Sequence, residues 1–496
     1  MRVAAIILLS SLFLMQTPVP RIWNDVDLAD WATPVAGLNV RPGHFTSAEY
    51  YSVPADNFRT YPVYPPDHEP SWYWEWLQRQ KPEPLVDAAR MKTTADWIAA
   101  GERAFREIDF VLARTNDPQT IGRTREKDTF GNSFLLRDGS VSDPRWVITD
   151  QGLMLTTSDC SSCHVRFNEA ERSIVPAGPL VPWPESNPFI RPPGLPITDF
   201  FGRMVSRQFP DEPFGIAFWR TAATPWAPDT RIDDLRDMKS ARDLGPLFGG
   251  NNGGVPRVNG SPFYGSKVPD LHLLRYYRYL DATGTHRLRG PEDIARYIAQ
   301  VSSGDSMEFG PHLMLAPKQR RVTYRFADEV LYAIGVYLMS LEPEKNPFAA
   351  EPALVENGRL IFEREGCGNC HAPPNYTNGK LTPATGFEVP ASHPNLVDVM
   401  AASLDTDPGL AMKTRKGTGF YKVPSLRGVW SRPFLLHDGS VTSLEEFFDA
   451  ARLHNDYAPR GWNPPGVTRR AVPGHTFGLN LSAGDKRTLI AFLKDL

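Results

Sequence analysis

The chain lacks an excess of charge of either sign, and it contains very little cysteine. Its net charge is −3 over 496 residues, and no long basic or acidic run occurs, so nothing indicates nucleic-acid binding. Its N-terminal apolar run, Ala4 to Met15, is too short for a comfortable membrane span. Only four cysteines are present, so their arrangement carries most of the chemical information.

All four cysteines fall in two C-x-x-C-H motifs, at residues 160–164 and 367–371. Two thiols at this spacing attach a haem c, and the adjacent histidine becomes the proximal ligand of its iron. A tetrathiolate zinc site, two dithiol redox motifs or two disulfides would not explain a histidine after both second cysteines. The sequence therefore predicts two covalently bound haem c groups, held by Cys160, Cys163, His164, Cys367, Cys370 and His371.

The N-terminus has the order of a secretory signal, because one positive charge at Arg2 precedes the short apolar run. No clear cleavage site follows, so residues 1–20 are expected to be either a signal peptide or an N-terminal anchor. Covalent haem attachment also points outside the cytoplasm. The predicted location is therefore the periplasm or the exterior.

The 47 prolines and 38 glycines indicate extensive ordered loop. Residues 21–90, rich in proline and aromatic residues, are expected to form a wrapping arm with little regular structure. Helical patterns appear at 94–106 and 354–365. The predicted fold is mainly α: two cytochrome c-like domains, 91–342 and 348–496, with long irregular loops and a few short β-hairpins.

An internal repeat supports two related domains. Residues 267–271 (KVPDL) match 422–426 (KVPSL) at an offset of 155, and the same offset places 336–338 on 491–493. Residues 336–338 and 491–493 each lie near the end of an amphipathic helical pattern. Ser482 with Asp485 suggests a capping box at the start of the C-terminal pattern. Residues 134–140 also echo 434–440, which we interpret as a recurring turn.

The second axial ligands decide what two haems can do, because an iron with one protein ligand can bind dioxygen or peroxide. After the second motif, His475 lies in a loop that leads into the last helix, where small cytochromes commonly place the distal ligand. We expect His475 to be the sixth ligand of the second iron. The alternatives are His437 and then His454.

The first domain has no histidine between His164 and His272, and the repeat offset maps His475 onto Arg320. The first iron is therefore predicted to be open or weakly capped, with hydrogen peroxide or dioxygen as its small-molecule oxidant. Arg320 could place a positive charge near this pocket, although a solvated charge beside Lys318 and Arg321 is the simpler interpretation. Residues that remain possible as caps are Met204, Met238, His272, His286, His312 and Met314.

The two haem motifs, together with the runs 422–427 and 433–446, resemble those of the dihaem cytochrome c peroxidase superfamily. The resemblance covers about residues 90 to 496 and is strongest in the last 140. It departs from the bacterial peroxidases in two ways: His475 stands where they have methionine, and no distal histidine follows the first motif. This ligand pattern is more similar to the dihaem rubber oxygenases.

The resemblance carries further implications. It implies peroxidase-like or dioxygenase chemistry, a hydrophobic organic substrate in the second case, and a redox partner protein. It also implies an aromatic relay between the haems, with Trp219, Trp226 and Tyr264 as candidates. The turn at 431–433 partly matches the family's calcium-binding turn, so a calcium ion is a weaker implication.

Overall fold

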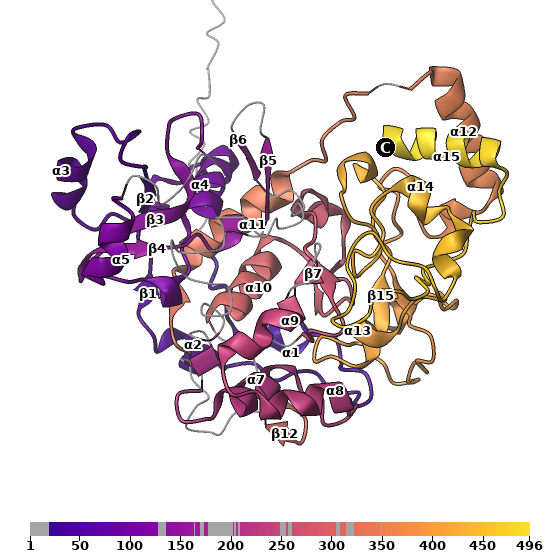
Figure 1. Ribbon diagram of the computed structural model, residues 1–496, viewed down its shortest axis with the longest axis horizontal. Coiled ribbons are helices and arrows are strands. Elements are labelled where there is room, and N and C mark those ends of the chain that lie inside the picture. Colours follow the sequence, from indigo (N-terminus) through magenta and orange to yellow (C-terminus); the bar gives the residue numbers. More distant parts are fainter. Residues whose placement is uncertain are drawn as a thin grey trace, which may run out of the picture.

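The chain is mainly α, with short β-hairpins and two separate helical cores (Figure 1). None of the described helices is long and apolar enough to cross a membrane. The structure is a computed structural model, and it describes residues 19–126, 135–162, 164–168, 173–176, 202, 205–206, 209–248, 254–255, 260–303, 308–313, 322–348 and 350–496. The predicted signal segment therefore lies almost wholly outside the described residues.

Five helices of thirteen or fourteen residues build the two cores: α4 Thr94–Glu107, α10 Pro291–Ser303, α11 Asp328–Ser340, α12 Pro352–Arg364 and α15 Ala483–Asp495. The other helices are short: α1 Asp25–Ala29, α2 Ser47–Tyr51, α3 Tyr73–Gln78, α5 Pro118–Arg123, α7 Phe214–Ala222, α8 Thr230–Asp233, α9 Gly245–Phe248, α13 Gly409–Met412 and α14 Leu444–Phe447.

One three-stranded antiparallel sheet has the order β2-β3-β4, from β2 Thr60–Val63, β3 Val141–Thr149 and β4 Gly152–Thr156. The remaining strands form pairs, of which only the first is parallel: β1 Ala55–Asp56 with β13 Arg325–Phe326, β5 Val165–Asn168 with β6 Ser173–Pro176, β7 Gly254–Val255 with β8 Ser266–Lys267, β9 Tyr279–Leu280 with β10 His286–Arg287, β11 Glu308–Phe309 with β12 His312–Leu313, and β14 Leu381–Pro383 with β15 Phe420–Lys422.

The first core is built where α4 crosses α11, with α10 packed on the other side of α11. Thr93 begins α4 with a complete capping box, so the helix predicted at 94–106 is confirmed. Gly101 lies at the crossing point, where a Cβ atom would stand only 2.0 Å from the carbonyl oxygen of Ala333. The two backbones can therefore approach closely only because this residue is glycine.

The second core repeats this crossing, with α12 in place of α4 and α15 in place of α11. A Cβ atom on Gly358 would lie 2.3 Å from the carbonyl oxygen of Thr488, and the offset of 155 carries Ala333 onto Thr488. The same offset carries the whole of α11 onto α15. The internal repeat seen in the sequence is thus a repeated helix crossing.

An aromatic pair supports each crossing in the same register. Phe105 of α4 lies against Tyr337 of α11, with ring centroids 6.0 Å apart, and Phe362 of α12 lies against Phe492 of α15 at 5.4 Å. At the start of α15, Ser482 accepts from the backbone N–H of Asp485, but the Asp485 carboxylate pairs with Arg364 at 3.0 Å. Only the serine half of the expected capping box is therefore present.

The arm at 21–90 contains three short helices and two short strands joined by irregular chain, and its first part packs on the first core. Trp23 and Trp31 are almost fully buried against the first core. On the side of the second core, the N–H of Ala36 donates to the carbonyl of Gly417 at 2.9 Å. Trp23 and Trp31 thus anchor an otherwise irregular segment.

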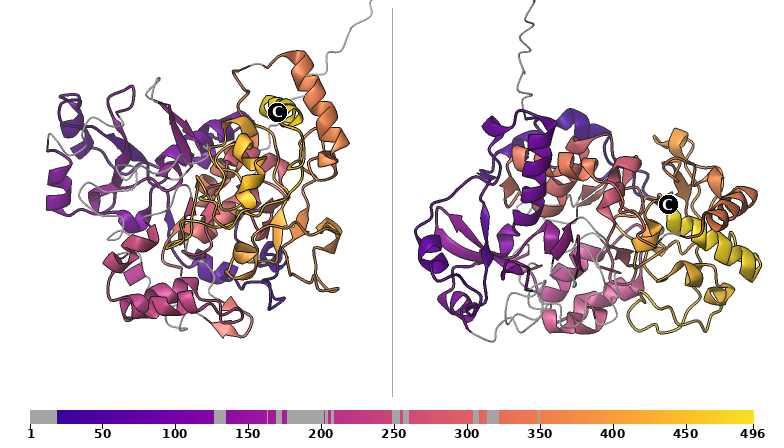
Figure 2. Two further views of the ribbon diagram at one scale, coloured as in Figure 1. Left: turned by 45° about the vertical axis from the view of Figure 1, so that its right-hand side comes forward. Right: turned by 90° about the horizontal axis from the view of Figure 1, so that it is seen from above.

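The two halves meet along a seam that uses the repeated sequence. The N–H of Lys267 donates to the carbonyl of His437 at 3.0 Å, and the N–H of Lys422 donates to that of Ala282 at 2.9 Å. Each half therefore places its KVP segment against the other half. Figure 2 shows the C-terminal half against the middle of the chain in both further views.

The echo between residues 134–140 and 434–440 is confirmed as a recurring turn in its described part. Asp138 accepts from the N–H of Ser140 at 3.0 Å, and Asp438 accepts from that of Ser440 at 3.0 Å. The glycine between them has a positive φ in both copies, 83° and 75°. A short aspartate–serine turn is thus used twice, once in each half.

Candidate haem sites

The second C-x-x-C-H motif begins directly after α12. Gly366 ends the helix in the left-handed conformation, with φ of 70°, and the one-turn 3-10 helix Cys367–Asn369 follows. The N–H of His371 donates to the carbonyl of Cys367 at 2.9 Å, which folds the motif into a tight turn. Both thiols and the imidazole are therefore carried by one rigid turn at the end of a core helix.

The ring of His371 is held in one tautomer. Its Nδ1 lies 3.0 Å from the carbonyl oxygen of Pro424 and 3.2 Å from that of Tyr376. Both partners can only accept, so Nδ1 carries the proton and Nε2 keeps the lone pair. A backbone carbonyl on the far ring nitrogen is the arrangement that orients metal-ligating histidines, so His371 fits the role of a proximal iron ligand.

The thiols of the second motif are suited to covalent attachment rather than to redox exchange. Cys367 and Cys370 are not joined in a disulfide. Burial raises the pKa of Cys367 to about 11 and also raises that of Cys370. Catalytic dithiols need a lowered pKa, because the thiolate is the nucleophile. This environment argues against the dithiol alternative.

The loop that carries His475 is fixed by a buried arginine. Arg452, fully buried, donates to the carbonyls of Phe447, Val472 and His475, each at 2.8 Å. Hydrogen bonds from a charged donor are among the stronger ones, and three of them determine the path of this loop. The position of His475 is therefore set by packing inside the second core.

His475 presents an unsatisfied ring nitrogen inside the protein. Its Nδ1 is buried without a hydrogen-bond partner in the described part of the chain, and its ring packs against Phe447 at 5.0 Å. Burial, and then the charge of nearby His371, lower the pKa of His475 to about 4. Two neutral imidazoles that lie close enough to influence each other fit a pair of axial iron ligands.

The other histidines of the second core lie in different surroundings. His437 lies against Tyr421 with ring centroids 4.4 Å apart, and one of its ring nitrogens lies within 4.8 Å of a carboxylate oxygen of Asp407 and of Asp438. Asp438 is already paired with Arg470 at 3.1 Å. His454, the other alternative, is exposed. His393, which also follows the second motif, accepts the N–H of Asn395 at 3.2 Å.

The suggested calcium turn at 431–433 is occupied by hydrogen bonds of its own. Ser431 donates to the carbonyl of Gly428 at 3.0 Å, and Arg432 donates to that of Ser425 at 2.8 Å. Arg432 also lies 3.8 Å from the Asp270 carboxylate. The calcium ion stays a prediction.

The described part of the first motif repeats the turn of the second. Residues Cys160–Ser162 form a 3-10 turn, and the N–H of His164 donates to the carbonyl of Cys160 at 3.0 Å. Cys160 packs against the first core, and the preceding Asp159 accepts from Ser302 of α10 at 2.9 Å. The sequence predictions for Cys163 and Arg320 fall outside the described residues.

Four residues considered as caps of the first iron are described, and each has another environment. His272 pairs with Asp270 at 2.8 Å, and His286 bonds to Thr285 at 3.0 Å. His312 lies against Trp226 at 5.5 Å, and Met238 packs in a separate cluster around α7. The other two candidates, Met204 and Met314, lie outside the described residues.

Of the predicted relay residues, Trp219 bonds to Asp233 at 3.1 Å, Trp226 packs against Phe309 at 5.1 Å, and Tyr264 bonds to Asp229 at 2.5 Å. These contacts place all three in the region around α7 and α8.

An aromatic residue that sequence reasoning missed lies at the seam. Tyr277 accepts from the N–H of Ser425 at 3.3 Å, one residue after the carbonyl that holds His371. It also packs against the first core, and the Lys422 ammonium lies 3.9 Å above its ring. In the sequence, Tyr277 is marked only by its position six residues after the KVPDL segment at 267–271.

No protein-family model matches the chain, and no curated protein matches its sequence. Among solved structures, hydrazine synthase from Kuenenia stuttgartiensis aligns at 14% identity with a TM-score of 0.28, over 59% of this chain and 87% of that one. A MauG-like protein associated with microbial copper homeostasis aligns at 17% identity with a TM-score of 0.28, over 64% and 92%. Likeness at this level carries no argument, so the assignment depends on the residues described above.

Proposed function

We propose that this chain is a dihaem c-type cytochrome oxidoreductase of the periplasm. His164 would hold the iron at which peroxide or dioxygen reacts, and His371 with His475 would hold the iron that relays electrons. Haem c bound at these motifs would supply one-electron chemistry at iron. A redox partner protein and, for a dioxygenase, a hydrophobic organic substrate complete the proposal.

The observation that carries this proposal is the difference between the two centres. In the second core, His371 is held by two backbone carbonyls, and His475 faces the interior with an unpartnered nitrogen. The repeat that relates the two cores maps His475 onto Arg320, which does not ligate iron. The two cores share the same helix crossing but differ in the histidines available to the iron. This difference favours one haem that stores an electron and one haem that reacts with the oxidant.

Tyr277 supports electron exchange between the centres. Hydrogen bonds and covalent bonds connect its ring to His371 through Ser425 and Pro424, while its other side packs in the first core. The Lys422 cation above the ring disfavours a positively charged tyrosine intermediate, because like charges repel in a low-dielectric interior. We infer that Tyr277 serves as a bridge without being oxidised itself.

The test is to assay the purified dihaem protein for hydrogen peroxide turnover and, in parallel, for oxygen uptake on polyisoprene. Turnover in one assay identifies the chemistry as peroxidase-like or as oxygenase-like. A protein that accepts and donates electrons but is inactive in both assays would instead be an electron-transfer cytochrome. The two-site proposal would then be wrong.

A further inference from the structure

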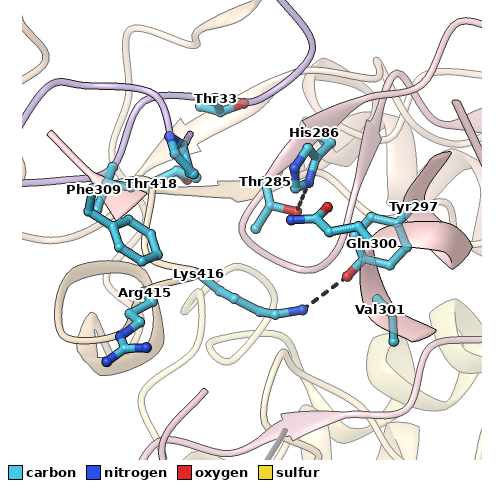
Figure 3. Close-up of a pocket in the computed structure, with 12 residues that line it drawn as sticks. Thr33, Thr285, His286, Tyr297, Gln300, Val301, Phe309, Arg415, Lys416 and Thr418 are labelled. Carbon is cyan, nitrogen blue, oxygen red and sulfur yellow. Dashed lines mark hydrogen bonds between the residues drawn. The ribbon is translucent and has the colours of Figure 1, made fainter. Parts of the chain in front are cut away.

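A small, partly open cavity of about 30 Å³ lies where three parts of the chain meet (Figure 3). The arm contributes Thr33, the first half contributes His286 with Tyr297 of α10, and the second half contributes Lys416 and Thr418. None of the described residues of either haem motif lines it. The cavity therefore forms only when the arm and both halves are assembled.

His286 is buried in this wall, with 5% of its surface exposed. Its Nδ1 lies 3.0 Å from the hydroxyl of Thr285, and that hydroxyl bonds to the Asp281 carboxylate at 3.0 Å. A threonine has one hydrogen to donate, and the carboxylate can only accept it. The Thr285 oxygen must therefore accept from Nδ1, which leaves the lone pair of His286 on Nε2.

That lone pair has no hydrogen-bond partner in the part of the chain that the structure describes. Burial lowers the pKa of His286 well below its usual value, so the ring stays neutral and Nε2 stays an acceptor. The residues on either side of His286 are fixed by backbone bonds, from the N–H of Thr285 to the carbonyl of Leu280 at 3.1 Å and from the N–H of Arg287 to that of Trp31 at 2.9 Å. The His286 ring itself lies against that of Trp31 at 4.1 Å, so its direction is fixed. A rigid, unsatisfied acceptor thus lines the cavity.

The neighbouring hydroxyls are acceptors as well. Thr33 donates its hydrogen to the carbonyl of Gly284 at 2.6 Å, and Thr418 donates its hydrogen to the carbonyl of Thr283. Each oxygen accepts one N–H, from Asn395 and Phe420 respectively, and keeps one lone pair. A cavity lined by these acceptors favours a small molecule that has a hydrogen-bond donor at each end.

The charged side chains near the cavity do not change its preference for a hydrogen-bond donor. The Lys416 ammonium lies 3.3 Å from the Asp281 carboxylate and 3.0 Å from the hydroxyl of Tyr297, so it is balanced within the wall. Arg415 turns its guanidinium away from His286 (Figure 3) and donates to the carbonyl of Ala223 at 2.8 Å. His44, whose ring lies 5.8 Å from that of His286, is neutral because burial lowers its pKa to about 4.

We propose that this cavity binds hydrogen peroxide, with one O–H donated to Nε2 of His286 and the other toward the hydroxyl oxygens of Thr33 and Thr418. One water needs roughly 10–15 Å³ of such a cavity, so about 30 Å³ suits two oxygen atoms. The choice of peroxide over two separate water molecules rests on the proposed function. The site itself rests only on the acceptors and the volume.

The test is a series of crystals of the holoprotein soaked in increasing hydrogen peroxide, with His286→Leu crystals as the matched comparison. We expect density for two bonded oxygen atoms beside Nε2 in the unmodified protein. In the variant, half-occupancy should require about tenfold more peroxide, the equivalent of about 1.4 kcal/mol for one lost hydrogen bond.

Three outcomes would overturn the site: density that does not change with peroxide, an empty cavity, or equal occupancy in the variant. The unmodified crystals alone decide the question if the variant does not fold. Peroxide bound in a protein that is inactive in both the peroxide and the polyisoprene assay would reject the proposed function and keep the site. Activity in either assay without bound peroxide would reject the site and keep the proposed function.

Discussion

At the scale of single residues, the carbonyl of Pro424 determines what His371 can do. By accepting the Nδ1 proton it turns Nε2 into the only ligating atom of that ring. Pro424 belongs to the KVP segment that the sequence repeats. The partner on the other face is then the residue to test.

Replacing His475 by alanine tests that partner. We expect the second haem to change from low spin to high spin, because the substitution removes one of two strong-field imidazoles and leaves the other. Electron paramagnetic resonance of the ferric protein measures the change. His454→Ala is the control, since that residue is exposed and should leave the spectrum as it is. A low-spin signal that survives His475→Ala removes this residue as the ligand.

The sequence was sufficient to select His475 as a candidate, but not to explain its position. The motif spacing and the place of His475 before the last helix are visible in the chain. The buried Arg452 that holds its loop is not, since its three carbonyl partners come from segments up to 23 residues away. Contacts of this kind depend on tertiary packing, which a linear pattern does not contain.

At the scale of elements, each of the two helix crossings requires a glycine where the helix backbones meet. Gly358→Ala places a methyl group 2.3 Å from the Thr488 carbonyl, so α12 and α15 must separate. We expect a loss of about 1–3 kcal/mol, the usual cost of overpacking. The midpoint of urea unfolding of the holoprotein measures it.

Gly484→Ala is the matched control on α15 itself. A methyl group there meets only the Ser482 hydroxyl, at 3.7 Å, an ordinary contact. Alanine favours the helix over glycine, so this variant should be unchanged or stabilised by up to about 1 kcal/mol. Equal stability of the two variants would show that the crossing is not as close as described.

The helices of both crossings were predictable because their apolar periodicity and their spacing from the haem motifs are local signals. The pattern at 94–106 corresponds to α4, and the pattern at 354–365 corresponds to α12 with a start two residues earlier. The path of the arm at 21–90 was not predictable in detail. Its strands form only by pairing with residues far away, as β1 does with β13.

At the scale of the whole molecule, the account requires two covalent haems on one chain. Cys163→Ala should leave one, because only the motif at 367–371 then keeps both thiols. Mass spectrometry of the denatured protein counts the attached groups, and Ser162→Ala should retain two. Two haems on the Cys163→Ala protein would mean that the first motif has been misinterpreted.

The central claim is that one iron carries an imidazole on each face while the other keeps a face open to an oxidant. The most direct measurement is the electron paramagnetic resonance spectrum of the purified, fully oxidised protein. We predict one high-spin ferric haem and one low-spin haem with two imidazole ligands, in equal amounts. Two low-spin haems would contradict it, because neither iron would then have a position for peroxide or dioxygen.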